Sequence, residues 1–191
     1  MRHTLFGEKS EEVAKCYSNM AHVFLRTDGL DSARVYAEKA LHIRLDTTAT
    51  DDCGALGQSY YDMARVEQSS SHAQKALEYL LQALPLISEC KGEYNESMAE
   101  LCNSLAVAYV KVDSVRAAFS WYEKALEIEK KLYGEESAQV ALLYSNLSAA
   151  YYDMKDCRTA IEYINMSIEK YKKVYSDIQR LNIPYRGGKV Q

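Results

Sequence analysis

Apolar side chains along this chain recur every three or four residues, which is the spacing of one face of an α-helix. The clearest stretch contains Leu101, Leu105, Ala108, Tyr109 and Val112. Asp113-Ser114 interrupts this pattern, and a second apolar face follows, formed by Ala118, Trp121, Tyr122, Ala125, Ile128 and Leu132. Gly134 then tolerates the left-handed backbone that commonly closes a helix. The pattern predicts two antiparallel helices, over residues 94–112 and 115–133.

The same two-helix pattern occurs four times. Small residues in the second helix of each copy lie 43, 42 and 42 residues apart, at Ala40, Ala83, Ala125 and Ser167. The other expected helices cover residues 9–27 and 30–46, 53–69 and 72–90, and 136–154 and 157–175. A fixed period of this size predicts an all-α solenoid whose helix pairs bury their apolar faces against their neighbours.

Three features recur in these copies. A small residue follows a large apolar one in the first helix, as in Met20-Ala21, Met63-Ala64, Leu105-Ala106 and Leu147-Ser148. An aromatic residue lies three positions further on in three copies, at Phe24, Tyr109 and Tyr151. Alanines stand seven apart in the second helix, as at Ala118 and Ala125.

These residues resemble the tetratricopeptide repeat (TPR) family. The usual unit of that family has about 34 residues. The longer unit here, with its Leu132-Tyr-Gly-Glu135 connector, is similar to the repeats of kinesin light chains. The resemblance implies a right-handed α-solenoid of antiparallel helix pairs and a role in protein binding.

The repeat also predicts the division of the chain. We expect a connector at 1–8, four repeats at 9–50, 51–92, 93–134 and 135–176, and a short helical extension with a flexible tail at 177–191. Residues 5–14 align with the connector at 132–141, so we expect a helix pair before residue 1 and a larger parent protein. Glu67 stands where the other copies carry an aromatic residue. It is interpreted as a tolerated half-exposed glutamate, with a local weak point or a functional surface as the alternatives.

Composition narrows the range of functions. The formal net charge of −4 argues against nucleic-acid binding, which usually requires a concentrated basic face. The sequence contains neither a membrane-spanning apolar run nor a secretory signal. Five cysteines without metal-type spacing favour unpaired thiols in a reducing compartment. The expected location is the cytoplasm or a cytoskeletal structure.

Catalytic motifs are not found. The sequence lacks a phosphate-binding glycine loop, a nucleophile elbow and a His-Glu-x-x-His motif, and its four histidines are scattered along the chain. We therefore expect no catalytic residues, no metal site and no cofactor. The protein is predicted not to be an enzyme.

In the family that this chain resembles, the first helices line a concave wall. Side chains on that wall are predicted to bind a partner peptide, namely Ser18, His22, Arg26, Tyr61, Arg65, Asn103, Lys111, Ser145 and Tyr152. Arg26, Arg65 and Lys111 would meet acidic side chains of the partner, while serines and asparagines would pair with its backbone. The alternative interpretation is a solvated wall that binds nothing.

A clamp for a C-terminal carboxylate, as in chaperone-binding repeats, is disfavoured because Asp62 and Glu100 occupy matching places. The predicted function is a scaffold or adaptor that binds a protein or peptide. The alternative is an architectural segment that self-associates, or assembles a larger complex, through its helix ends or outer face. A homo-oligomer is compatible with this alternative.

Overall fold

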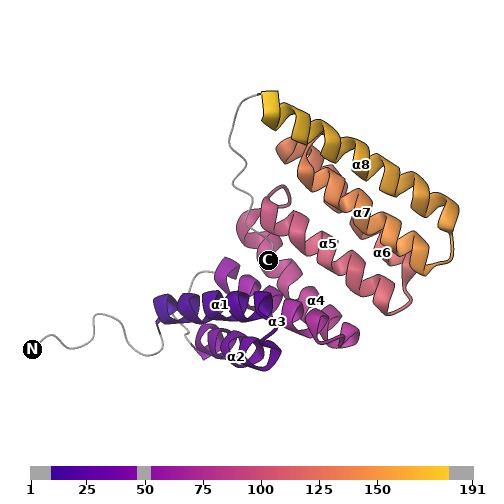
Figure 1. The fold of residues 1–191 in the computed structure, drawn as a ribbon. Helices are drawn as coiled ribbons and strands as arrows, with labels where there is room; N and C mark the ends of the chain where they lie inside the picture. Colours follow the sequence, from indigo (N-terminus) through magenta and orange to yellow (C-terminus); the bar gives the residue numbers. More distant parts are fainter. Residues whose placement is uncertain (1–9, 47–52, 181–191) are drawn as a thin grey trace, which may run out of the picture.

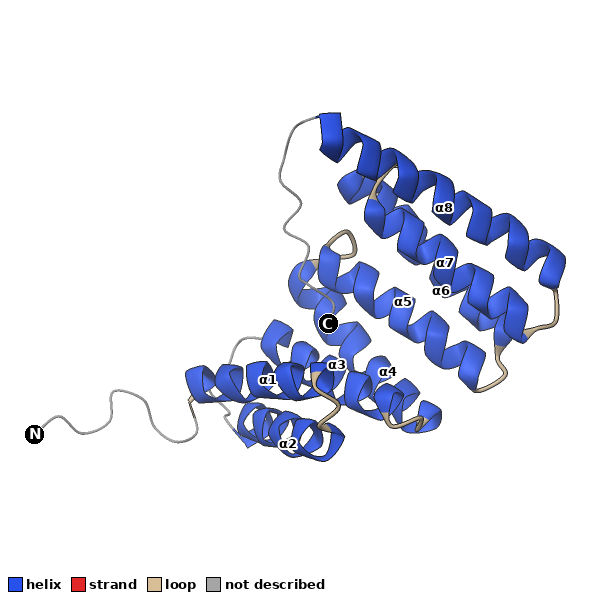
Figure 2. Cartoon of the chain, viewed as in Figure 1, coloured by secondary structure: helices blue, strands red, loops and turns tan. Residues whose placement is uncertain are grey.

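The computed structural model describes residues 10–46 and 53–180, and this part of the chain forms eight helices and no strand. Figures 1 and 2 show the helices following one another along an array. They are α1 (Glu11–Arg26), α2 (Leu30–Asp46), α3 (Cys53–Ser69), α4 (Ala73–Lys91), α5 (Glu96–Lys111), α6 (Val115–Tyr133), α7 (Ala138–Asp153) and α8 (Cys157–Arg180). The prediction of an all-α solenoid is confirmed.

Each odd-numbered helix packs against the helix that follows it, and each even-numbered helix packs against the first helix of the next pair. First helices also contact each other, α1 with α3 and α5 with α7. The observed helix bounds lie close to the predicted ones, except that α8 ends at Arg180 rather than near residue 175. The expected tail after that lies outside the described residues.

The turns within the four pairs share one backbone conformation. Asp28, Ser71, Asp113 and Lys155 each have a positive φ, between 56° and 68°. A single residue in the left-handed conformation lets the chain reverse direction within a short turn. Glycine adopts this conformation most readily, followed by Asn and Asp. The first helices begin alike as well, because the side chains of Ser10, Asn95 and Ser137 accept a hydrogen bond from the backbone three residues on. The repeat therefore extends to the backbone of its turns and caps.

Small side chains let the paired helices approach closely. Alanines at the predicted crossings are fully buried, including Ala21, Ala64 and Ala106 in the first helices. The fourth pair carries serines instead, and their hydroxyls donate to the partner backbone. Ser148 Oγ donates to the Ala160 carbonyl at 2.8 Å, and Ser167 Oγ to the Ala141 carbonyl at 2.7 Å. A serine is thus accommodated because its hydroxyl is paired.

The buried apolar residues form two clusters. A small cluster joins α1, α2 and α3 around Ala21, Ala33, Ala37, Met63 and Val66. A larger one continues from α3 to α7 and includes Leu80, Leu105 and Tyr122. The apolar core is therefore divided near the joint between the first and second helix pairs.

Candidate functional site

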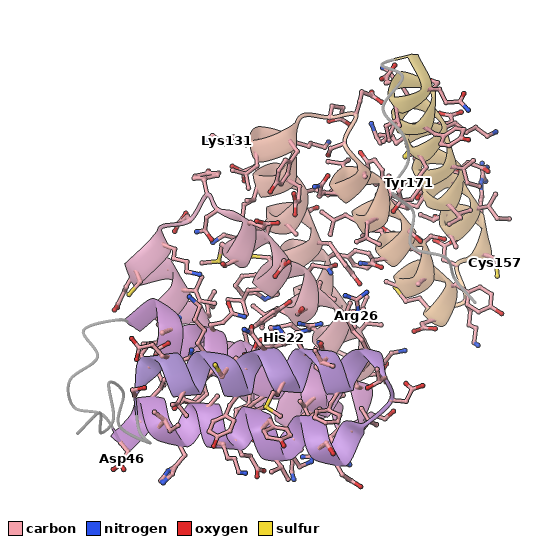
Figure 3. The ribbon with its side chains drawn as sticks, turned by 60° about the vertical axis from the view of Figure 1, so that its left-hand side comes forward. His22, Arg26, Asp46, Lys131, Cys157 and Tyr171 are labelled. Atoms are coloured by element: carbon pink, nitrogen blue, oxygen red, sulfur yellow. The ribbon has the colours of Figure 1, made fainter. Side chains whose placement is uncertain are left out.

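The first helices are connected to each other by polar side-chain pairs. His22 of α1 lies 2.8 Å from Asp62 of α3, and Asn146 of α7 donates to Asn103 of α5 at 2.8 Å. Lys111 of α5 forms a 3.1 Å ion pair with Asp153 of α7. Neighbouring first helices thus form one continuous layer, and most of the predicted wall residues belong to it. In Figure 3, His22 and Arg26 lie on the side of α1 that faces away from α2.

The nine predicted residues differ in accessibility. Arg26, Lys111 and Tyr152 are exposed. His22, Arg65, Asn103 and Ser145 are half-buried at the edges of their helices. These seven side chains reach the surface at least in part, and their contact with a partner stays a prediction.

Two predicted contacts are wrong. Tyr61 is buried, and its hydroxyl lies 3.2 Å from Ser104 Oγ, because its ring fills the space between α3 and α5. Burial raises the pKa of Tyr61, although the hydrogen bond with Ser104 opposes this effect. Ser18 is also buried, and its hydroxyl accepts a hydrogen bond from Arg44 at 3.2 Å. Both side chains hold helices together and are not presented to a ligand.

Two small cavities flank α5 on its Lys111 side. One, of about 230 Å³, lies between the C-terminal end of α3 and α5. It is lined by Gln68, Ser71, Ala73, Val107, Ala108 and Lys111. The other, of about 180 Å³, lies between α5 and α7 and includes Asn146, Ala149 and Asp153. Val107 and Lys111 line both cavities. We call the surface formed by the two cavities the α5 groove.

Charges of both signs surround Arg65. Partial desolvation and the nearby Glu96 raise the pKa of Glu100, while Arg65 and His22 oppose this shift. Asp62 is buried, and its Oδ1 accepts hydrogen bonds from His22 and Gln58. Its Oδ2 has no hydrogen-bond partner within the described part of the chain. The wall is therefore a mixed polar surface and not a uniformly basic one.

Sequence reasoning missed a buried ion pair at the first joint. Glu67 is 2% exposed and not half-exposed as expected. Its carboxylate pairs with Arg34 of α2, and its Oε2 lies 2.7 Å from His72 Nδ1. Burial alone would raise the pKa of Glu67, but the hydrogen bonds from His72 and Arg34 hold it below its usual value.

A signal for this pair was present in the sequence. Arg34 occupies the position of Leu77 and Phe119 in the following copies, and Glu67 that of Tyr109 and Tyr151. At the joint between α6 and α7, the ring centres of Phe119 and Tyr151 lie 4.6 Å apart. When two contacting positions both depart from the pattern, the departure indicates that an ion pair replaces the apolar pair of the other joints.

A buried cation lies at the same joint. Arg44 of α2 donates to the Glu11 carboxylate at 2.7 Å and to Ser59 Oγ of α3 at 2.6 Å. The guanidinium is thus paired on several sides, as a buried charge requires. The first joint therefore contains two buried charged groups, Glu67 and Arg44, in directed polar contacts.

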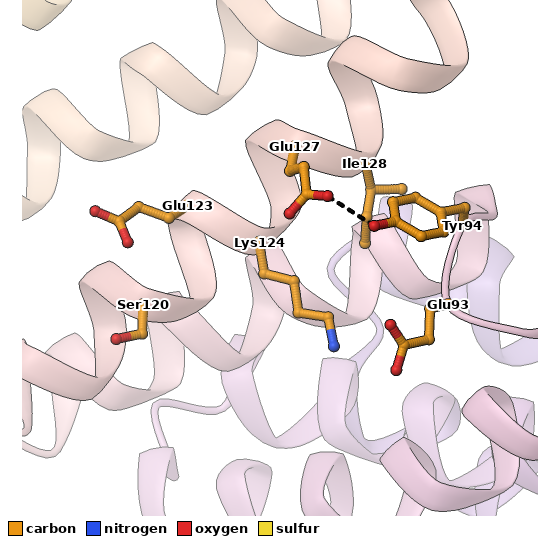
Figure 4. Close-up of a pocket in the computed structure, with 7 residues that line it drawn as sticks. All are labelled: Glu93, Tyr94, Ser120, Glu123, Lys124, Glu127 and Ile128. Carbon is orange, nitrogen blue, oxygen red and sulfur yellow. Dashed lines mark hydrogen bonds between the residues drawn. The ribbon is translucent and has the colours of Figure 1, made fainter.

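A shallow pocket of about 310 Å³ lies on the outer side, between α6 and the connector that precedes α5 (Figure 4). The Tyr94 hydroxyl donates to Glu127 at 2.7 Å, which raises the pKa of Tyr94. The Lys131 ammonium lies 3.6 Å from the centre of the Tyr94 ring. Glu93, Glu123 and Lys124 are also part of the lining. The pocket therefore presents charged groups of both signs.

The remaining sequence-based expectations concern metals, membranes and thiols. No cluster of His, Cys, Asp and Glu suited to a metal ion occurs in residues 10–46 and 53–180. Within the same residues, no helix has the length and apolar character needed to cross a membrane. Cys16, Cys102 and Cys157 are free, but Cys90 is disulfide-bonded, so the expectation of unpaired thiols is wrong for Cys90. The cytoplasmic location stays a prediction.

Solved structures with the same fold include two arrays of this kind. BtubC (BKLC) from P. vanneervenii is 24% identical, with a TM-score of 0.72 over 85% of this chain and 64% of that one. The nearly identical TPR-like repeats of a Podosopora anserina putative kinesin light chain are 18% identical. Their TM-score is 0.68 over 90% of this chain and 81% of that chain. At these identities the likeness shows the fold alone.

Curated relatives include the clustered mitochondria protein homologs of Emericella nidulans and Aspergillus niger, each 24% identical over 123 residues. The match covers 64% of this chain but spans only 10% of the length of those proteins.

Two family models, both described as tetratricopeptide repeat, match residues 13–47 and 96–173, together more than half of the chain. The matched ranges flank the second repeat, whose pattern departs most from the others at Glu67. The matches agree with the helix pairs, the 42-residue period and the buried alanines at the crossings. The chain belongs to the tetratricopeptide repeat family, and its repeats resemble those of kinesin light chains.

Proposed function

We propose that this protein is a non-catalytic adaptor that holds a peptide segment of a partner protein along the layer of first helices. The family and the fold support protein binding in general. The observation that carries the specific proposal is the α5 groove, because its two cavities share Val107 and Lys111 and together touch three neighbouring repeats. Apolar surface from Val107 and Ala149 lies beside the polar groups of Gln68, Lys111 and Asn146. Such a mixture suits an amphipathic helix or an extended peptide.

Acidic and apolar residues are the proposed content of the partner peptide. The ammonium group of Lys111 is exposed, and Asp153 neutralises it in the free protein. A partner carboxylate would compete with Asp153 for this group. Arg65 and Arg26, which are half-buried and exposed, are two further cationic side chains of the first helices. Because these contacts are exposed, they would contribute selectivity and association rate more than raw affinity.

The test is charge reversal in the groove. Arg65→Glu combined with Lys111→Glu is expected to abolish capture of partners from lysate. The matched control is Lys75→Glu with Arg116→Glu, which makes the same charge change at exposed positions of α4 and α6. Circular dichroism of both variants should match that of the parent. The affinity of an isolated partner should also fall with added salt, because exposed charges are screened within about 8–10 Å.

The opposite outcomes are equally clear. Recovery of the same partners by the groove variant would place binding elsewhere. Loss of capture by the control variant as well would show that net charge, and not the groove, attracts the partners.

A further inference from the structure

The fold leaves one carboxylate buried without full pairing. Glu129 of α6 is 8% exposed, and its Oε2 has no hydrogen-bond partner in the described part of the chain. Burial raises the pKa of Glu129, and the charges of Glu96 and Glu100 of α5 add to this shift. Burial and like charges thus both oppose the ionised form, so this carboxylate lowers the stability of the free protein at neutral pH.

The groups around Glu129 form an acidic site. Glu96 and Glu100 lie one turn apart on α5, and α6 packs against α5 in the same helix pair. Because the two helices are antiparallel, the start of α5 faces the end of α6. Partial desolvation and the charges of Glu96 and Glu129 also raise the pKa of Tyr133, the last residue of α6. Glu96 and Glu100 are exposed, so the acidic site of Glu96, Glu100 and Glu129 opens to the surface.

Cations near this site do not neutralise it. Desolvation and Glu96 raise the pKa of Glu100. The charges of Arg65, His22 and Lys91 oppose this shift without cancelling it. The acidic site therefore keeps an excess of carboxylates and suits one further cation.

The first repeat carries a filled version of the acidic site. Glu11 follows the N-cap of α1 as Glu96 follows that of α5. Arg44 and Glu129 are equivalent as well, because each lies four residues after the crossing alanine of its second helix. In the first repeat, the Arg44 guanidinium donates to both oxygens of Glu11, at 2.7 and 3.1 Å, and to Ser18 Oγ at 3.2 Å. The third repeat keeps the carboxylate of the first helix and has a second carboxylate in place of the guanidinium.

We propose that the acidic site binds an arginine side chain of a partner protein, so that the partner supplies the guanidinium that the third repeat lacks. A guanidinium carries five N–H donors in a planar fork and can therefore bridge carboxylates of two helices. The exposed Glu96 and Glu100 would receive it from solvent, and its charge would favour the ionised form of Glu129. A binding role also accounts for a carboxylate that lowers the stability of the free protein, as groups at functional sites often do.

The acidic site lies apart from the α5 groove. Lys111 of the groove is the last residue of α5, whereas Glu96 is the first. The inference does not depend on peptide capture by the α5 groove, and failure of the groove variants would leave it standing.

Nuclear magnetic resonance titration with N-acetyl-arginine methylamide tests the proposal, because this probe presents one guanidinium on a neutral backbone. The amide signals of the first turns of α5 and the last turns of α6 should shift and saturate at millimolar probe, as expected for so small a ligand. The citrulline counterpart, which has the same shape without the charge, should cause no saturable shift. The lysine counterpart should bind more weakly, since its ammonium lacks the planar fork.

Two variants and a control locate the site. Glu129→Gln should weaken binding of the arginine probe about tenfold, because a charge-assisted hydrogen bond becomes a neutral one. Glu129→Arg should abolish binding and raise the melting temperature, because its own guanidinium would pair with Glu96 as Arg44 pairs with Glu11. Glu123→Gln, at an exposed carboxylate of the same helix, is the matched control and should bind like the parent. Circular dichroism should show the variants folded.

Three results would overturn the proposal. Shifts that do not saturate, or that follow exposed carboxylates throughout the chain, would show general charge attraction. Equal binding of the citrulline probe would remove the role of the charge. Parent-like binding by Glu129→Gln, which decides the test even where Glu129→Arg fails to fold, would place the guanidinium elsewhere.

Discussion

The buried pair at the first joint leads to a quantitative stability prediction. Replacing Arg34 by Leu leaves Glu67, which is 2% exposed, with His72 as its remaining hydrogen-bond partner. Removing one partner of a fully buried ion pair costs about 3–5 kcal/mol. The Arg34 side chain is 28% exposed, and His72 still pairs one carboxylate oxygen. We therefore expect a smaller loss in the free energy of unfolding, about 2 kcal/mol.

A second substitution makes the test specific. Arg34→Leu combined with Glu67→Tyr places at the first joint the residue types that Leu77 and Tyr109 supply at the next one. Exchanging a buried ion pair for packed apolar side chains is often neutral or stabilising. The double variant should therefore be more stable than Arg34→Leu alone and within about 1 kcal/mol of the parent.

Chemical denaturation followed by circular dichroism measures these differences, and hydrogen exchange locates them in α1, α2 and α3. The pH dependence supplies an independent check. The folded pKa of Glu67 is lowered, so the folded state binds fewer protons than the unfolded state in acid. This contribution to stability is present above the unfolded value of 4.5 and is lost as pH falls through the folded pKa.

The Glu67-dependent part of the acid sensitivity should be smaller in Arg34→Leu and absent from the double variant. The reasoning would be refuted if Arg34→Leu were as stable as the parent. It would also fail if the double variant were no more stable than the single one.

Three further predictions concern the core, a buried carboxylate and the groove. Ala125→Leu should destabilise the third pair by about 1–3 kcal/mol in thermal or chemical unfolding, because Ala125 is fully buried at a helix crossing; an unchanged melting temperature would contradict this packing. Burial, together with Glu96 and Glu100, raises the pKa of Glu129, and its Oε2 has no hydrogen-bond partner among the described residues. The resulting loss of stability is absent below the unfolded pKa and grows as pH rises through the folded one. Glu129→Gln should therefore raise the melting temperature at neutral pH but have little effect in acid; equal effects at both would refute the assignment. Reversal of Arg65 and Lys111 should abolish partner capture, whereas reversal of Lys75 and Arg116 should not, as measured by pull-down.

Periodicity alone predicted the eight helices, because apolar spacing and the turn residues between the helices repeat together. The positions of the helix crossings could also be predicted, from small residues such as Ala64 and Ala106, since a larger side chain there would hold the helix axes apart. The fold could therefore be predicted from local patterns that recur in each copy of the repeat.

The candidate site was less accessible. Tyr61 and Tyr152 both follow a tyrosine in the first helix of a copy, yet Tyr61 is buried against α5 while Tyr152 is exposed. The two tyrosines occupy different repeat positions, equivalent to Asn103 and to Val110. Tyr61 contacts Ser104 of the following repeat, and the pattern within one copy carries no information about its neighbour. Glu67 was misinterpreted for the same reason, since its partner Arg34 lies in the preceding repeat.

The polar first joint bears on how the repeats keep their order. Copies with the same apolar faces could in principle stack in the wrong sequence, because dispersion and the hydrophobic effect are not directional. Arg34 and Arg44 pair with groups on α1 and α3. In a wrong stacking order, the buried Arg44 guanidinium and the buried Glu67 carboxylate would lack these partners. The charged groups at the division of the core therefore make one position in the array favourable for the first repeat. Uniform apolar packing would not distinguish this position from the others.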